Sequence, residues 1–453
     1  MGKSRVKLIA AIAIATILGF SIILVALPNI FKIGGTPTPA STKQTTSMPV
    51  SCEMPYVLIS IYKGDSKFPS DVLSYVRDYF KQFIPENQEL AVCVIPWNSS
   101  MLQGKTLRIY PALAIKAENV SKELMEYFGE KIGENIYIIK YPIVVDLATR
   151  TNIPVQYGYQ AKAILVQGVS EYSRLDNQTL ANELRRLLSL IAIANVTEVV
   201  LDDYTNYPDI KAFPAVLFSS NMNLSEQLPY LKRYDGKFLV DTRYALPLAG
   251  LISLSLGVQV YAEIHGEKPE VGVVIGKNDT SASLIVFVDL ACSYCAKLIN
   301  ETLPKLDALV DEGKISISYA FSPSPHMMRE HALLQCYVNV TGDSSGYVKL
   351  TRMLAEKLLN ERRIVSESEL KSLMRSIYGA SLNYTELDVC ANTTGSSIVR
   401  ETIYEASKLG IAATPTIIVW NNKENMGLII EGYIPADELM KVVEAVSKLK
   451  IST

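Results

Sequence analysis

The stretch that decides the fold is Ser283-Leu-Ile-Val-Phe-Val-Asp-Leu-Ala-Cys-Ser-Tyr-Cys295. Its apolar first half predicts a buried strand, and apolar residues at helical spacing continue through Val310 and predict an amphipathic helix. Cys292 therefore lies where a strand turns into a helix, and free N–H groups and the helix dipole there stabilise a thiolate. Cys295 lies one turn further along, close enough to attack a mixed disulfide at Cys292. The stretch predicts a redox-active dithiol.

A Cys-x-x-Cys pair has two other readings, half of a zinc site or a structural disulfide. Zinc would need two more ligands, but the chain has no second Cys-x-x-Cys, and its histidines, His265, His326 and His331, are not spaced as ligands. A structural disulfide is disfavoured because a strand-to-helix turn is where thiols become reactive. We expect no metal and no cofactor beyond the redox-active disulfide itself.

An X-Pro dipeptide followed by an apolar strand occurs three times, as Tyr110-Pro-Ala-Leu-Ala-Ile, Phe213-Pro-Ala-Val-Leu-Phe and Thr414-Pro-Thr-Ile-Ile-Val. Before each of the first two prolines the apolar pattern predicts a strand, a helix and a second strand. In the first copy these elements cover 56–62, 70–83 and 90–95, and in the second copy they cover 163–169, 180–194 and 197–201. After them, Asn119-Val-Ser-Lys-Glu-Leu and Asn223-Leu-Ser-Glu-Gln-Leu each predict a serine N-cap that opens a helix. The N-terminal half therefore contains two diverged copies of one α/β unit.

The third copy begins near Val271 and has its first strand at 284–288. Its X-Pro strand comes later than in the other copies, and the extra residues, about 326–406, have helical patterns at 346–361 and 367–378. We interpret them as a helical insertion.

The N-terminus predicts a membrane anchor. Lys3, Arg5 and Lys7 precede an uncharged apolar run over 8–27, which is long enough to span a bilayer. The charge bias predicts a cytoplasmic N-terminus and a body outside the membrane, at the end of a Thr/Ser/Pro-rich stalk. A cleaved signal peptide is the alternative, but the run is longer than the usual signal core.

Sequons support export. Ten Asn-X-Ser/Thr sites are glycosylation candidates: Asn98, Asn119, Asn177, Asn195, Asn223, Asn278, Asn300, Asn339, Asn383 and Asn392. The net charge of −2 and the lack of a basic stripe give no indication of nucleic-acid binding.

Three ordered motifs resemble the DsbA-like thioredoxin-fold family: the segment Ile275 to Cys295, the loop Gly410-Ile-Ala-Ala-Thr-Pro-Thr-Ile-Ile-Val, and Gly432-Tyr-Ile followed by a helix over 436–449. The resemblance covers about 271–449 and includes the place of the insertion. It implies that Cys292 is the nucleophile and Cys295 the resolving thiol. It also implies that Pro415 is a cis-proline facing them, while Thr414 offers backbone groups to an extended substrate strand.

The chain departs from the family pattern at two positions. Ser293 follows the first cysteine where the family often has proline, and Val286 occupies the place of a buried acid found in some thioredoxins. Asp289 is expected to be an exposed loop acid with a structural role. The direction of electron flow, as oxidase, isomerase or reductase, therefore stays open.

The other four cysteines form two candidate structural disulfides. Cys336 and Cys390 bracket the insertion, where some members of the resembled family carry a second disulfide. Cys52 precedes the first strand and Cys93 lies in the second, and these strands can be neighbours in a parallel βαβ unit. Buried free thiols are the alternative, but disulfides persist in exported chains.

The expected fold is α/β in five parts: an N-terminus and transmembrane helix (1–33), a stalk (34–50), two non-catalytic units (51–153 and 154–267) and a DsbA-like thioredoxin domain with its insertion (268–453). The non-catalytic units are interpreted as degenerate thioredoxin-like, with a ferredoxin-like unit as the alternative. Their strand-to-helix turns, 63–70 and 168–177, have no cysteine. They are expected to hold unfolded substrate or to set the distance from the membrane.

The predicted function is an extracytoplasmic, single-pass membrane thiol–disulfide oxidoreductase, an oxidase or isomerase, that exchanges disulfides with exported proteins. As an oxidase it would need a re-oxidant in the membrane. The alternatives are a glycosylated surface binding protein with a structural Cys-x-x-Cys disulfide, and a reductant that feeds a partner enzyme.

Overall fold

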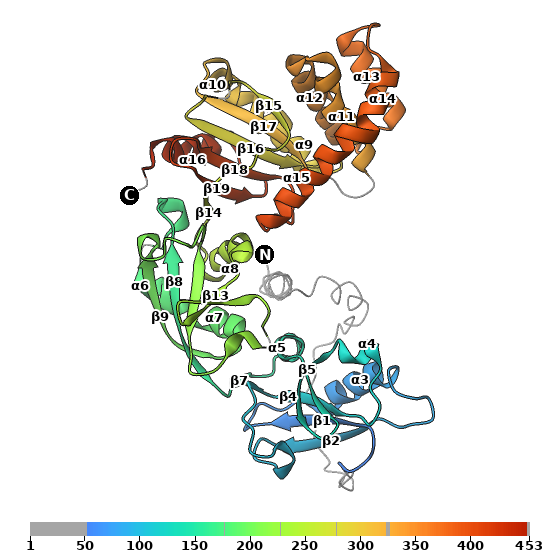
Figure 1. Ribbon diagram of the computed structural model, residues 1–453, viewed down its shortest axis with the longest axis vertical. Coiled ribbons are helices and arrows are strands. Elements are labelled where there is room, and N and C mark those ends of the chain that lie inside the picture. The colour runs from blue at the N-terminus through green and yellow to red at the C-terminus, as the bar shows by residue number, and fades with distance from the viewer. Residues whose placement is uncertain (1–51, 176, 227, 278, 323–326, 451–453) are drawn as a thin grey trace.

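The computed structural model describes residues 52–175, 177–226, 228–277, 279–322 and 327–450. The expected anchor and stalk and the sequon at Asn278 lie outside this range. Within it, every helix is too short or too polar to cross a bilayer. The described chain folds into three α/β units that follow one another along the long axis of the molecule (Figure 1).

Unit 1 is a five-stranded sheet in the order β2-β1-β4-β6-β5. Its main elements are β1 (Val57–Tyr62), α3 (Ser70–Lys81), β2 (Ala91–Pro96), β4 (Ala112–Lys116), α4 (Lys122–Met125), β5 (Phe128–Gly133), β6 (Ile136–Ile139) and α5 (Tyr141–Arg150). Strand β1 pairs in parallel with β2 and antiparallel with β4, the strand that follows the first X-Pro dipeptide.

Unit 2 repeats this arrangement in the order β9-β8-β11-β13-β12. Its main elements are β8 (Gln160–Gln167), α6 (Gln178–Glu183), α7 (Arg185–Ala192), β9 (Asn195–Asp203), β11 (Ala215–Ser219), β12 (Leu231–Tyr234), β13 (Lys237–Val240) and α8 (Ala245–Leu256). In both units the first two strands are parallel neighbours, whereas a ferredoxin-like, split βαβ unit would leave another strand between them. The topology therefore favours the thioredoxin-like interpretation.

The predicted serine N-caps after the X-Pro strands have different outcomes. The Ser121 hydroxyl accepts a hydrogen bond from the Leu124 N–H and opens α4, which is only four residues long. The prediction for Ser225 is wrong, because Ser225 lies inside a single 3-10 turn, Leu224–Glu226. There the Ser225 hydroxyl bonds to the Asn223 side chain instead.

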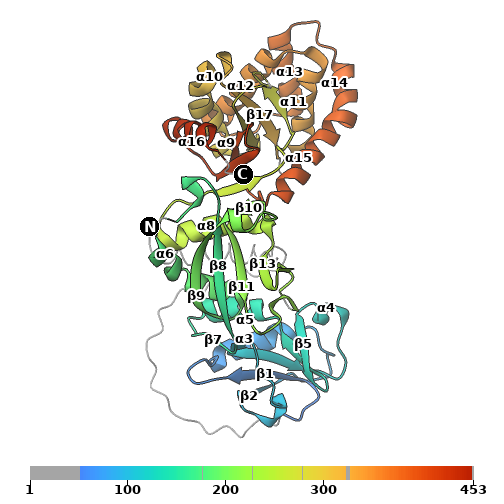
Figure 2. The same cartoon turned by 60° about the vertical axis from the view of Figure 1, so that its left-hand side comes forward.

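Unit 3 is built around β16 (Ala282–Val288), which is buried along its whole length between parallel β17 (Ile315–Phe321) and antiparallel β18 (Thr416–Asn421). The remaining strands and the C-terminal helix are β15 (Val273–Ile275), β19 (Met426–Glu431) and α16 (Ala436–Lys448). The insertion consists of α11 (Met328–Thr341), α12 (Ser344–Glu361), α13 (Glu367–Tyr378), α14 (Tyr384–Cys390) and α15 (Ser396–Lys408). Figures 1 and 2 both show α12, α13 and α14 gathered at the end of the molecule farthest from unit 1.

The helix that follows the Cys-x-x-Cys pair is not the continuous one that its periodicity predicts. It begins as α9 (Ser293–Lys297), continues as a π-helical turn over 298–302 and a 3-10 turn over 303–306, and ends as α10 (Asp307–Asp311). Pro304 accounts for the break, because proline has no N–H for the helical ladder and its ring crowds the preceding turn.

The units are interleaved at their junctions. Strand β14 (Ala262–His265), assigned from sequence to the second unit, pairs with β19 and extends the sheet of unit 3. Strand β10 (Ala212–Phe213) adds to β14, so the sheet order is β10-β14-β19-β18-β16-β17-β15. The boundary expected at 267 therefore lies too far along the chain. Strand β14 precedes it, but the hydrogen-bonding partner of β14 is β19, so β14 belongs to the sheet of unit 3.

Candidate active site

The turn that carries the Cys-x-x-Cys pair is shaped by its own backbone and by Asp289. The Asp289 carboxylate accepts a hydrogen bond from the Ala291 N–H at 2.9 Å, and the Asp289 carbonyl accepts one from the Cys292 N–H at 3.1 Å. The expectation of an exposed acid is wrong, since only 9% of Asp289 is exposed. Cys292 is then the N-cap of α9, as the sequence predicts.

The two thiols lie in different surroundings. Cys292 is half-buried, whereas Cys295 is fully buried and accepts a hydrogen bond from the Asp289 N–H at 3.4 Å. The pKa of Cys292 is lowered to about 6, and the largest cause is a hydrogen bond from the Cys295 thiol. Partial burial opposes this effect by raising the pKa. Hydrogen bonds from the N–H groups of Cys295 and Tyr294 and from the Thr414 side chain lower it further. Burial, together with the bond to Cys292, raises the pKa of Cys295. The burial and the pKa directions of the two thiols are therefore consistent with the predicted roles of Cys292 as nucleophile and Cys295 as resolving thiol.

The pH dependence of alkylation tests this difference. In the reduced protein, the rate of Cys292 modification by iodoacetamide should rise about tenfold per pH unit below 6 and level off above it, because only the thiolate reacts. Cys295 should stay unmodified in the folded protein. Peptide mass mapping after short pulses measures both, and a Cys292 midpoint near pH 8.5 would contradict the assignment.

The loop at Thr414-Pro415 faces the nucleophile from 122 residues away in the chain. Its peptide bond is cis, as are Tyr110–Pro111 and Phe213–Pro214. The Thr414 carbonyl accepts a hydrogen bond from the Cys292 thiol at 3.4 Å. The Pro415 carbonyl accepts a hydrogen bond from the Gly432 N–H at 2.8 Å, which holds the loop in place. The structure therefore brings all four predicted site residues together.

His331 is a site residue that the sequence analysis missed. It lies on α11, is fully buried, and its Nε2 accepts a hydrogen bond from the Leu290 N–H at 3.1 Å, while Nδ1 lies 2.7 Å from the Met327 carbonyl. Burial lowers its pKa to about 4, so the ring is neutral and can accept from the turn that precedes Cys292. No spacing signal connects His331 with that turn, because the contact is made by the insertion.

Replacement of His331 with glutamine should change the acid stability of unit 3. A buried histidine with a pKa of about 4 stabilises the fold fully above its ordinary value of about 6.5, and this contribution is lost as the pH falls toward 4. The wild type should therefore lose more stability than His331→Gln between pH 7.5 and 4.5, by urea unfolding at each pH. An equal loss in both proteins would show that His331 does not resist protonation.

The remaining cysteines are paired as the sequence suggested. Cys336 on α11 is joined to Cys390 on α14 across a Cα separation of 5.8 Å. Cys52, just before β1, is joined to Cys93 on β2 across 5.5 Å. Among the described residues, no group of three or more His, Cys, Asp or Glu side chains could hold a metal ion.

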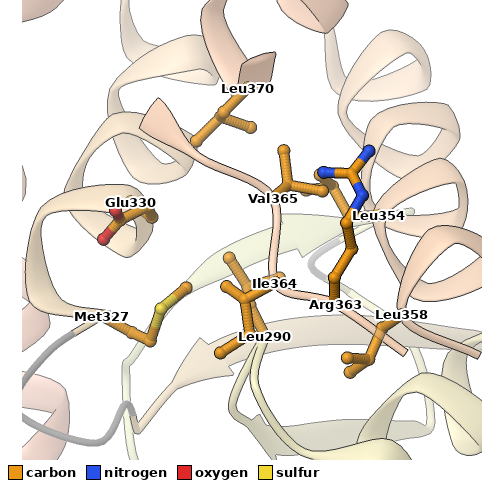
Figure 3. A pocket seen from close by; sticks show the side chains of 9 residues that line it. All are labelled: Leu290, Met327, Glu330, Leu354, Leu358, Arg363, Ile364, Val365 and Leu370. Carbon is orange, nitrogen blue, oxygen red and sulfur yellow. The ribbon is translucent and has the colours of Figure 1, made fainter. Parts of the chain in front are cut away.

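A small apolar recess borders the redox turn (Figure 3). Leu290 lies at its base, and Ile364 and Val365 reach it from the link between α12 and α13. Met327, Leu354, Leu358 and Leu370 complete its apolar lining, and Glu330 and Arg363 are the two charged residues that also line it. The insertion therefore brings an apolar surface up to the residues that precede Cys292.

Together, the sheet order, the Cys-x-x-Cys turn and the facing X-Pro loop define a thioredoxin-like domain. A family model described as Thioredoxin matches residues 268–444, and no curated protein matches the chain. Solved structures similar to this region include BdbD of Bacillus subtilis (22% identity, 41% of this chain and 97% of that chain, TM-score 0.34). A second is α-DsbA1 of Wolbachia pipientis (18% identity, 40% of this chain and 93% of that chain, TM-score 0.33). A third is DsbA of Chlamydia trachomatis (20% identity, 39% of this chain and 92% of that chain, TM-score 0.32).

Proposed function

We propose that the chain is a thiol–disulfide oxidoreductase that passes the Cys292–Cys295 disulfide to thiols of exported proteins. The observation that carries this proposal is the asymmetric pair: an accessible thiol of lowered pKa over a buried thiol of raised pKa, beside the Thr414 backbone. A dithiol with only a structural role would not need this asymmetry.

The proposed transfer of the disulfide to the substrate consists of two thiol–disulfide exchange steps. A substrate thiolate attacks the Cys292 sulfur of the disulfide, the Cys292–Cys295 bond breaks, and Cys295 leaves and takes up a proton. A second substrate thiolate then attacks the substrate sulfur of the mixed disulfide, and Cys292 leaves as a thiolate. The substrate loses two electrons and the protein gains them. The lowered pKa of Cys292 favours this direction, because a stable thiolate is a good leaving group.

Export to the outer face of a membrane is part of the proposal. Two disulfides besides the redox pair are typical of a compartment that does not reduce them. Eight of the nine described sequon asparagines are exposed and accessible to a glycan. The ninth, Asn300, is half-buried with its amide against the α12 backbone at Arg352 and Glu356. Asn300 is therefore the described sequon expected to stay unmodified when glycopeptides of the native protein are mapped.

The reduction potential tests the proposed direction. Thioredoxin has a thiol pKa of about 7 and a reduction potential of about −270 mV, whereas the oxidant DsbA has a thiol pKa of about 3.5 and a reduction potential of about −120 mV. A change of one pKa unit corresponds to a change of about 30 mV in the reduction potential. A Cys292 pKa of about 6 then predicts roughly −240 to −195 mV, measured by equilibration with glutathione. The oxidised protein should also restore activity to a reduced enzyme that needs its disulfides. A potential near −270 mV would favour a reductant, and no transfer at all would favour a binding protein with a structural disulfide.

A further inference from the structure

A cavity of about 180 Å³, here called the junction cavity, lies where units 2 and 3 meet. Its floor is one face of the unit 3 sheet, and residues of β10, β14, β18 and β19 line it there. Its walls are the 3-10 turn Thr242–Tyr244 with the start of α8, and the end of α15. The described residues that line it include none of the four redox-site residues, so the junction cavity is separate from that site.

The floor of the junction cavity is apolar and is shaped by Trp420. Trp420 on β18 lies opposite Gly427 on β19, and Gly427 lies opposite Ile264 on β14. A Cβ at Gly427 would be 2.6 Å from the indole ring, so glycine leaves the room in which the ring lies over β19. Ile429 and Ala212 extend the apolar floor on either side.

Trp420 also brings a polar group to this floor. Only 1% of Trp420 is exposed, and its indole N–H has no hydrogen-bond acceptor among the described residues. An indole nitrogen can only donate, and a buried one normally has an acceptor. A ligand that carries oxygen can supply this acceptor, whereas a pure hydrocarbon cannot.

The rim of the junction cavity carries cations from three segments. Lys211 directly precedes β10, Arg243 lies in the 3-10 turn of unit 2, and Lys408 is the last residue of α15. Glu267 is the acid among the described lining residues that opposes them. Three cations and one carboxylate give these four side chains a formal charge of +2.

Lys211 is the cation that is most available to a ligand. Its ammonium group donates to the Pro208 carbonyl at 2.7 Å, and no carboxylate of the described chain lies within ion-pair distance of it. Lys408, in contrast, is paired with Glu405 of its own helix at 2.9 Å.

Arg243 has a carboxylate partner, but it shares that partner. Asp241 lies 2.8 Å from Arg243 and also 2.8 Å from Lys232, so one acid serves two cations. With these ion-pair partners included, the cations of the rim are Lys211, Lys232, Arg243 and Lys408, and the carboxylates are Asp241, Glu267 and Glu405. Four cations and three carboxylates leave one positive charge that the described chain does not neutralise.

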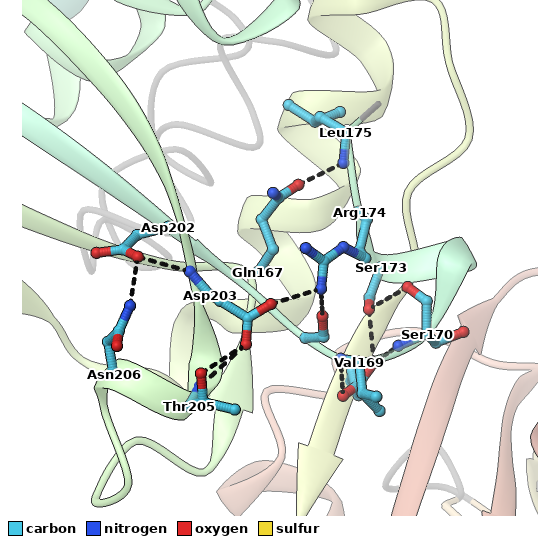
Figure 4. A network of polar contacts seen from close by, with 12 residues as sticks. Gln167, Val169, Ser170, Ser173, Arg174, Leu175, Asp202, Asp203, Thr205 and Asn206 are labelled. Carbon is cyan, nitrogen blue, oxygen red and sulfur yellow. Dashed lines mark hydrogen bonds and ion pairs between the residues drawn. The ribbon is translucent and has the colours of Figure 1, made fainter. Parts of the chain in front are cut away.

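The buried Glu263 carboxylate does not oppose an anion in the junction cavity. Ile264 lies on the floor, so its neighbours Glu263 and His265 direct their side chains to the opposite face of the sheet. There the His265 Nε2 contacts the Glu263 carboxylate at 2.5 Å. The same carboxylate accepts hydrogen bonds from the N–H groups of Val169 and Ser170, in the turn whose polar contacts Figure 4 shows.

We propose that the junction cavity binds a small organic anion, a carboxylate on an apolar body, and that this ligand links unit 2 to unit 3. Its carboxylate accepts hydrogen bonds from Lys211, Arg243 and Lys408, and its body packs on the floor around Trp420. A cavity of this volume has room for roughly ten non-hydrogen atoms. Lys211 and Arg243 belong to unit 2, whereas Lys408 and Trp420 belong to unit 3, so the ligand contacts both units.

Phenylacetate is a probe of this class, and the chain itself supplies the reporter. The two tryptophans are Trp97, in unit 1, and Trp420, so the emission of Trp97→Phe reports Trp420 alone. Phenylacetate should change this emission saturably, with a dissociation constant of about 1 mM or lower. Phenylacetamide has the same shape without the charge and should bind at least about tenfold more weakly, because charge-assisted hydrogen bonds are the stronger ones. Equilibrium dialysis of radiolabelled phenylacetate measures the same constant independently of fluorescence.

Two lysine variants test the rim. Lys211→Gln keeps a polar side chain but removes the charge, and it should weaken phenylacetate binding about fivefold or more. Lys441→Gln is the matched control, because Lys441 is exposed on α16 and does not line the junction cavity. It should bind phenylacetate as the wild type does, and so should Cys292→Ala.

Each outcome bears on a stated part of the proposal. Equal affinities for phenylacetate and phenylacetamide, or equal affinities of Lys211→Gln and Lys441→Gln, would overturn recognition of an anion. No binding in dialysis up to about 10 mM would overturn the site itself. Loss of binding in Cys292→Ala would place the ligand at the redox site and overturn the junction cavity as its location. Disulfide transfer without phenylacetate tests the proposed redox function alone, so the two proposals can fail separately.

Discussion

Replacement of Cys292 with alanine is expected to abolish disulfide transfer to protein substrates, by a factor on the order of 10³ or more. The physical reason is that Cys292 is the half-buried thiol of the pair, while Cys295 is fully buried beneath it. A substrate sulfur can reach Cys292 beside Thr414, but it cannot reach Cys295 without opening the fold. The measurement is the rate at which the oxidised protein restores activity to a reduced, disulfide-dependent enzyme.

Cys295→Ala is the matched variant and should fail differently. It keeps the nucleophile, so the Cys292 thiolate should attack a disulfide of an oxidised protein substrate, release one substrate sulfur as a thiolate, and remain as a mixed disulfide that mass spectrometry detects. Cys292→Ala should form none. Both proteins should keep their circular dichroism spectra. Transfer that persists in Cys292→Ala and disappears in a Cys336→Ala/Cys390→Ala double variant would instead locate the redox centre at the insertion disulfide.

Glu263→Ala is expected to cause the largest loss of stability of the single substitutions considered, about 3–5 kcal/mol. The Glu263 carboxylate is completely buried between units 2 and 3. Its loss would leave the N–H groups of Val169 and Ser170 without their acceptor, at a cost of about 1–3 kcal/mol each, and would open a cavity beside Gly168. The midpoint of urea unfolding, followed by far-ultraviolet circular dichroism, measures the effect.

Two further variants control this result. Glu263→Gln keeps one acceptor oxygen and should lose less stability, and alanine at the exposed Glu270 should change the midpoint little. Burial alone would raise the pKa of Glu263, but the hydrogen bonds from His265, Ser173 and the two backbone N–H groups outweigh it and lower the pKa. The contribution of Glu263 is therefore present above the ordinary carboxyl pKa of about 4 and is lost as the pH falls below it. A Glu263→Ala protein as stable as Glu270→Ala would contradict the role of Glu263 in joining the units.

The strand pairs at the unit junctions bear on what the N-terminal half does. The backbone before Pro111 is covered, because β3 (Ile109–Tyr110) pairs with β7 (Gln156–Tyr157), and the backbone before Pro214 is covered, because β10 pairs with β14. An unfolded substrate could pair with these backbones only if β7 or β14 first dissociated. Dissociation of β14 is further opposed because β14 is also hydrogen-bonded to β19 of unit 3. The unit 1–unit 2 contact is closed as well, since the buried Arg108 side chain donates to the carbonyls of Asn223 and Leu224. These contacts favour a spacer that sets the position of unit 3 over a second substrate-holding site.

The sequence by itself determined the parts of this protein that depend on neighbours along the chain. The apolar run before Asp289, the spacing of Cys292 and Cys295, and the repeated X-Pro strands predicted the first strand, the N-cap position of the nucleophile and the facing loop. Strand-helix-strand periodicity also predicted two related units, because alternating burial leaves a pattern in any amphipathic element.

Only the tertiary structure decided which backbone groups are covered and which side chains meet across the units. Strands β3, β7 and β10 are two residues long, too short to leave a periodic pattern. His331 acts on the turn before Cys292 through the insertion, and Asp289 is buried by the same packing. Glu263 is unremarkable in the sequence, because its importance comes from the donors that Val169 and Ser170 present to it across a junction. Local patterns determine the elements, but burial and pairing between distant segments determine which backbone and side-chain groups of each unit are covered.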